Sequence, residues 1–213
     1  MKNLFGYLKK ILLLSSLVFL FSLFNTQKIS AQQPNVLSSF QHYWDGETAN
    51  TTVLLTFQTT DSPIVITYYT VTIPDTEISP EIFSVSRNKE LEFTIHKKEY
   101  STDLVIDLEE TPVYPDKPAV IKITYSKKLS GNTISLLSQI KNTQTKEFSL
   151  TYPSSLGNIS WCSATILEIK SVENKIKITT EIPITEYVKV TFGENIIYSY
   201  VIKKNLLNAG DKM

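Results

Sequence analysis

Residues 103–108 read DLVIDL and residues 121–125 read IKITY, and in both stretches apolar and polar side chains alternate. A period of two is typical of a β-strand with one buried face. The same alternation recurs in residues 53–58, 90–95, 175–182, 188–192 and 196–202. These runs are rich in Thr, Val, Ile and Tyr, which suit a pleated surface. The chain is therefore predicted to be built mainly of half-buried strands.

Turn residues separate these runs at short intervals. Asp45-Gly46 and Glu173-Asn174 are expected to close tight hairpins. Residues 186–202 are predicted to form a third hairpin around Gly193, with Gly193 at positive φ. In that hairpin Val188, Val190 and Phe192 should face the core beside Tyr198 and Tyr200, whereas Lys189 should face solvent.

The fold class predicted from this pattern is all-β, an antiparallel β-sandwich that is either immunoglobulin-like or a larger multi-strand sandwich. Residues 129–141 allow either a helix or a loop with a short strand. Residues 111–118 contain three prolines, which do not fit a central strand. They either divide two small sandwiches or cross between strands of one sandwich, and their shortness favours the crossing.

The first 31 residues have the layout of a secretory signal peptide. Lys2, Lys9 and Lys10 precede the mostly apolar residues 11–24, and a short polar segment ends at Ala31. The apolar run is short for a membrane span. We expect a signal helix at residues 1–31 that is cleaved after Ala31, with an uncleaved anchor as the alternative, and a β-sandwich at residues 32–213. The predicted location is secreted or in the extracytoplasmic cell envelope.

Composition excludes several classes of partner. Removing residues 1–31 takes away four lysines and leaves an excess of about four acidic groups, interspersed along the chain. Nucleic-acid binding normally needs a basic face, and anionic lipid needs a polybasic segment. No nucleic acid is expected as partner, and contact with membrane is expected only through the signal segment. With a single cysteine, Cys162, neither an intramolecular disulfide nor a cysteine-based structural zinc site is expected.

Three residues could serve nucleophilic or metal chemistry. Cys162 would need a neighbouring His to become a thiolate, yet His42 and His96 lie far upstream. We expect Cys162 to be a buried, unreactive packing residue. The histidines could join Asp45 or Asp103 in a metal site, but they lack ligand spacing and are expected at the surface. No cofactor is predicted.

Acidic and aromatic pairs offer two further readings. The acidic pairs Glu109-Glu110 and Glu90/Glu92 could do glycosidase chemistry, but they are interpreted as solvated strand faces and ends. The aromatic pairs Tyr43-Trp44 and Tyr68-Tyr69 could stack on sugars, but in a sandwich such residues more often pack in the core.

The second half of the chain carries a family resemblance. In order it shows AVIKITYS, KKLSGNTISLL, KEFSLTYPSSLGN and EYVKVTFGENIIYSYVIKKNLLN, and Phe192-Gly193 before an aromatic strand is the best match. This resembles the N-terminal β-domain of exported bacterial transglutaminase-like proteins, over residues 51–208. In that family the β-module precedes a papain-like Cys-His-Asp domain. Here the sequence stops five residues after Asn208, and both histidines precede Cys162. The resemblance therefore implies a truncated reading frame or a stand-alone module, catalytically silent in either case.

These observations predict an exported, non-enzymatic β-sandwich that acts as a scaffold or protein-interaction module. It would be either the N-terminal part of a transglutaminase-like protein or an independent module. The partner would be a protein or a cell-surface glycan. A carbohydrate-binding module and a small exported hydrolase are the alternatives.

Overall fold

The computed structural model describes residues 34–193. The chain divides into two units, residues 1–33 and 34–213, and every described residue belongs to the second. Within the described range no helix has the length and apolar character needed to cross a membrane. The elements are β1 (Asn35–Trp44), β2 (Thr48–Gln58), β3 (Ile64–Ile73), β4 (Glu81–Ser84), β5 (Lys89–Glu90), β6 (Phe93–Lys97), β7 (Thr102–Val113), β8 (Ala119–Lys128), β9 (Thr133–Leu137), β10 (Gln144–Pro153), the 3₁₀ turn η1 (Ser154–Leu156), β11 (Asn158–Cys162), β12 (Ile166–Val172), β13 (Lys175–Thr180) and β14 (Tyr187–Gly193).

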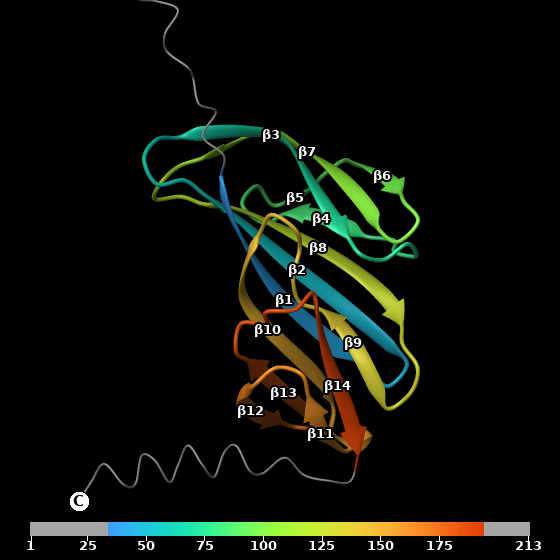
Figure 1. Cartoon of the computed structure of the whole chain (residues 1–213). Helices are drawn as coiled ribbons and strands as arrows, with labels where there is room; N and C mark the ends of the chain where they lie inside the picture. The colour runs from blue at the N-terminus through green and yellow to red at the C-terminus, as the bar shows by residue number, and fades with distance from the viewer. Residues whose placement is uncertain (1–33, 194–213) are drawn as a thin grey trace, which may run out of the picture. The chain divides into compact units, whose positions relative to one another are not determined.

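The largest sheet has eight strands in the order β12-β13-β10-β1-β2-β8-β4-β5. Figure 1 shows β1, β2 and β8 running side by side through its middle. All its pairs are antiparallel except β1 with β10, which are parallel. The expectation of a purely antiparallel fold is therefore wrong for this sheet. A parallel pair needs a long connection, and here β10 reaches β1 only after the chain has built β2 to β9.

Two three-stranded sheets, β11-β14-β9 and β3-β7-β6, accompany the large one. Figure 1 shows β9 and β14 lying across β1 and β2. Ring contacts confirm this, because Trp44 of β1 lies 4.5 Å from Phe192 of β14 between centroids. On the other sheet, Tyr69 of β3 meets Phe57 of β2 edge-on at 4.9 Å. The apolar faces of all three sheets therefore share one core.

Most of the alternating apolar residues lie inside, as the period of two predicts. The apolar side chains of residues 53–57, 104–108, 121–125 and 188–192 that share the predicted face are all buried. The predicted faces of residues 90–95 and 175–182 are buried only in part. Phe93 and Ile176 are half-buried and Ile95 of β6 is exposed. Ile182 is exposed because β13 ends at Thr180 and the alternation does not continue as a strand. All-β architecture with mainly antiparallel sheets is confirmed.

Two of the three predicted turns form. Gly46 has a φ of 112°, and Asp45 Oδ1 accepts hydrogen bonds from the backbone N–H groups of Glu47 and Thr48 at 2.9 and 2.7 Å. Glu173 takes a φ of 56° in the tight turn between β12 and β13. Gly193 differs from expectation, because its φ is not positive and it lies at the end of β14, opposite Asn158.

The second strand of the third predicted hairpin falls outside the described part of the chain. Residues 196–202, with the expected inward positions of Tyr198 and Tyr200, therefore stay a prediction. Within the described part, β14 pairs with β9 on one side and with β11 on the other.

Residues 129–141 contain the short strand β9 between loops, so the loop-and-strand alternative is confirmed and the helix is wrong. Of the proline segment, residues 111–113 end β7, the middle strand of its sheet, where Pro112 lies opposite Val65 of β3, so the expectation that these prolines stay out of a central strand is wrong for Pro112. Residues 114–118 form the turn that connects β7 to β8, closed by backbone bonds between Tyr114 and Lys117. This turn carries the chain from the β3-β7-β6 sheet back to the large sheet.

Candidate functional site

Cys162 lies in β11 opposite Val190 and packs against the core. It is half-buried rather than fully buried, which corrects the expectation in degree. Burial raises the pKa of its thiol, so the neutral form is favoured. Neither histidine is near it along the sheets, since His42 is in β1 and His96 in β6. The described arrangement therefore gives no support to a Cys–His pair.

His42 is fully buried, so the expectation that it lies at the surface is wrong. Its Nε2 donates to the carbonyl of Leu137 at 2.8 Å, and its Nδ1 lies 3.0 Å from the hydroxyl of Thr51. The ring also packs against Phe148, with centroids 5.2 Å apart. Burial lowers the pKa of His42 to about 4, partly offset by the bond to Leu137. The neutral imidazole therefore ties β1 to β2 and β9.

The proposed metal ligands do not come together. His96 is exposed on β6, opposite Asp103, and Asp103 is occupied by Lys98 at 2.5 Å and by the hydroxyl of Thr72 at 2.8 Å. Asp45 caps a turn of a different sheet. Within residues 34–193 no group of three or more such side chains could hold a metal ion.

Glu109 and Glu110 lie at an irregular point of β7. Both have positive φ, 47° and 53°, and three residues of β7 stand here against one of β3. Arg87 secures the bulge through its Nη1, 3.3 Å from the carbonyls of Leu108 and Glu109, and its Nη2, 2.9 Å from Glu109 Oε2.

Lys89 also binds the Glu109 carboxylate and, with Arg87, lowers its pKa. Glu109 is thus held as a paired anion, which suits a structural clamp and not a general acid. Glu90 and Glu92 are exposed, as expected.

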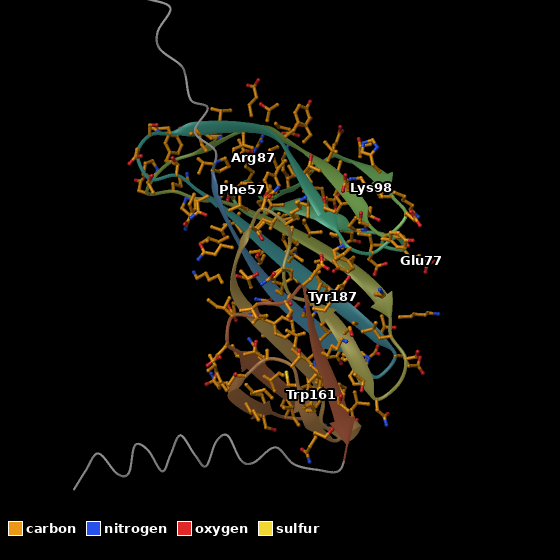
Figure 2. The ribbon with its side chains drawn as sticks, viewed as in Figure 1. Phe57, Glu77, Arg87, Lys98, Trp161 and Tyr187 are labelled. Atoms are coloured by element: carbon orange, nitrogen blue, oxygen red, sulfur yellow. The ribbon has the colours of Figure 1, made fainter. Side chains whose placement is uncertain are left out.

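The aromatic pairs divide between core and surface. Trp44 is buried, whereas Tyr43 faces outward under the ammonium of Lys175, 5.1 Å from the ring centroid. Tyr69 packs on Phe57, and Tyr68 is exposed. Trp161, which the sequence did not single out as a sugar platform, is half-exposed on β11 (Figure 2). Tyr68 and Trp161 belong to different sheets, so they do not form one stacking row.

A small hollow lies between the large sheet and β9, and sequence reasoning missed it. Asp75 binds Lys127 at 2.5 Å, and the hydroxyl of Tyr187 donates to the carbonyl of Pro74 at 2.6 Å. Tyr125 also lines it, and burial raises the pKa of both tyrosines, to about 12 for Tyr187. The hollow measures about 30 Å³, room for a water molecule or two. It is too small for a substrate.

The surface that stands out is the edge hairpin β12–β13. Within the described chain β12 has a neighbour on one side only. Leu167, Ile169 and Val172 on it are 50%, 49% and 66% exposed, and Ile182 and Ile184 follow, the latter 93% exposed. We call residues 166–184 the edge surface. Its β-period was recognisable in the sequence of β13, but its place at the rim of a sheet was not.

No protein-family model matches the sequence, and no curated protein matches it. Solved structures do resemble the fold. A mutant of an M1 zinc metallopeptidase from Deinococcus radiodurans, bound to a Tyr-Ser-Ala substrate, aligns with a TM-score of 0.51 at 10% identity, over 75% of this chain and 43% of that one. Another structure of the M1 zinc metallopeptidase from this organism gives a TM-score of 0.47 at 11% identity, over 75% and 42%. This chain thus spans less than half the length of the structures it matches, and at this identity the likeness concerns the fold alone.

Proposed function

We propose that this chain is an exported, non-enzymatic β-module that binds other polypeptides as a scaffold or interaction domain. The observation that carries the proposal is the edge surface. Exposed apolar side chains gathered on one element are typical of interaction sites. An unpaired sheet edge can also accept an added strand, because its free N–H and C=O groups provide main-chain hydrogen bonds.

The finer architecture belongs to the same proposal. The shared core of the three sheets supports a β-sandwich. Kinship with the N-terminal β-domain of transglutaminase-like proteins remains a prediction, since the structures reported above are metallopeptidases. In the first of them this fold accounts for under half of a longer chain, which supports a module that works beside a further domain.

Peptide capture tests the proposed function. The purified protein is immobilised at low density and panned against a displayed library of random peptides. We expect extended, apolar sequences to be enriched, because they add to the edge of β12. Ile169→Lys should abolish capture. Val65→Lys, a matched change of an exposed apolar residue on β3, should leave it intact. Equal loss or equal retention in the two variants would contradict the proposal.

The exposed ring of Trp161 favours one alternative, a carbohydrate-binding module. A glycan array separates the two functions. Binding of a glycan by the wild-type protein that Trp161→Ala removes and Ile169→Lys retains would replace polypeptide binding with sugar binding as the function of this region.

A further inference from the structure

The charges of β12 are arranged antisymmetrically about Ile169. Glu168 precedes it and Lys170 follows it, both on one face, with Glu168 Oε1 3.0 Å from Lys170 Nζ. Ile169 points to the other face, beside the buried Ile178 of β13. A strand whose charges change sign on either side of a central residue is complementary to an antiparallel copy of itself.

We propose that the occupant of this edge is a second copy of the chain, whose β12 pairs antiparallel with the first across a two-fold axis at Ile169. Glu168 then faces Lys170 of the second copy, and Lys170 faces Glu168 of the second copy. This is an isologous contact, in which the same patch serves both partners. The inference rests on the proposed function of the edge surface and names its partner.

The charges select this register. Residues directly opposite in an antiparallel pair share a face. A two-fold axis perpendicular to the sheet must therefore pass between one residue and the same residue of the second copy. An axis at Glu168 or at Lys170 would place that charge against its own copy, which is destabilising. An axis at Ser171 would oppose Lys170 to Val172. Of these four positions, Ile169 alone joins unlike charges.

The same register places an apolar contact on the opposite face, where Ile169 meets Ile169 of the second copy at the axis. Val172 is opposite Lys175 of β13, on the face of Glu168 and Lys170, so it does not add to this contact. The extra residue Leu167 makes β12 irregular at this point, since Ile166 and Glu168 pair with successive residues of β13. The regular pairing is therefore short, and the dimer is expected to be reversible in the micromolar range, as befits a small interface.

Charge reversal tests the pairing. Sedimentation equilibrium of the purified protein, from low-micromolar to near-millimolar concentration, should show a monomer–dimer equilibrium. Glu168→Lys or Lys170→Glu alone should raise the dimer dissociation constant by about tenfold or more, because both reciprocal pairs become like-charged. The double variant should return to the wild-type value, and a mixture of the two single variants should form heterodimers. Glu168 and Lys170 are both exposed, so the urea midpoints of all these variants should equal that of the wild type.

Cross-linking tests the register. In a Cys162→Ser background, Ile169→Cys should oxidise to a disulfide-linked dimer, since residues 169 of the two copies are opposite and within disulfide range. Ser171→Cys is the matched control. In this register residue 171 is opposite residue 167 of the second copy. The two residues 171 are therefore four residues apart along the strands, about 14 Å, which is too far for a disulfide. Faster cross-linking of Ser171→Cys would overturn the register.

A wild-type chain that stays monomeric throughout, or single variants that dimerise as the wild type does, would overturn the inference. If peptide capture still depends on Ile169 in that event, the proposed function stands without the dimer. If capture is also insensitive to Ile169→Lys, both are overturned.

Discussion

His42 shows how one buried side chain can couple stability to pH. Burial holds its pKa at about 4, against 6.5 in an exposed histidine. Between these values the unfolded chain takes up a proton on His42 and the folded chain does not, so stability falls as the pH drops. The two pKa values correspond to a loss of about 3 kcal/mol between pH 7 and pH 4.

Urea melts at pH 7 and pH 5 should therefore show a lower midpoint at pH 5 for the wild type. His42→Gln removes the titrating group, so its two midpoints should lie closer together. Asp75 and Asp103, whose pKa values are lowered, affect stability only at more acid pH. Parallel pH dependence in the wild type and His42→Gln would contradict the assignment.

Cys162 is expected to react slowly with thiol reagents. It is half-buried and its pKa is raised by burial, so little thiolate is present at neutral pH. Cys162→Ser should lower stability by about 1 kcal/mol, because the hydroxyl takes a polar group into the margin of the core. Labelling by a bulky disulfide reagent is the measurement. If the native protein is labelled as fast as the urea-unfolded chain, the thiol is accessible and the expectation is wrong.

At the scale of the element, β14 has one face inside and one outside. Phe192 is 6% exposed and contacts both Trp44 and Tyr152, whose centroids lie 4.5 and 4.9 Å away. Phe192→Ala should cost about 3–5 kcal/mol, the usual range for a buried aromatic. Lys189→Ala, on the exposed face, should cost under about 0.5 kcal/mol. Denaturant melts decide the assignment, and equal midpoints would refute it.

The bulge of β7 gives a second test at this scale. Glu110 occupies a left-handed conformation that glycine adopts without steric cost. Glu110→Gly should therefore leave stability unchanged or raise it by up to about 1 kcal/mol. Thr70→Gly, at a regular exposed position of β3 opposite Val105, should lower it by about 1 kcal/mol. Melting midpoints measure both, and a larger loss for Glu110→Gly would mean that the φ is not left-handed.

For the molecule as a whole, the leader stays a prediction, since residues 1–33 lie outside the described part. Export followed by cleavage after Ala31 should give a protein that begins at Gln32. N-terminal sequencing of the exported protein measures this. Ala31→Phe should block cleavage, because the site requires a small residue. A wild-type protein that begins at Met1 would show that the leader is kept as an anchor.

The local sequence pattern predicted the buried face of most strands, because the side-chain period of a strand is a property of the backbone. Val53, Leu104 and Val190 lie inside for the same reason that their neighbours lie outside. The Asp45-Gly46 turn was equally predictable, because positive φ and a short side-chain acceptor are local requirements.

What the sequence by itself determined is therefore the all-β class, the faces of most strands and the tight turns. Which strands lie side by side was decided by the tertiary structure, since pairing joins residues such as Phe40 and Phe148 that are distant along the chain. This pairing of strands buries His42, brings Lys127 to Asp75 and places β9 and β11 on the two sides of β14. It also left β12 at the rim, where Leu167, Ile169 and Val172 are exposed. Burial and neighbours depend on contacts between distant segments, and a period of two in the sequence does not encode them.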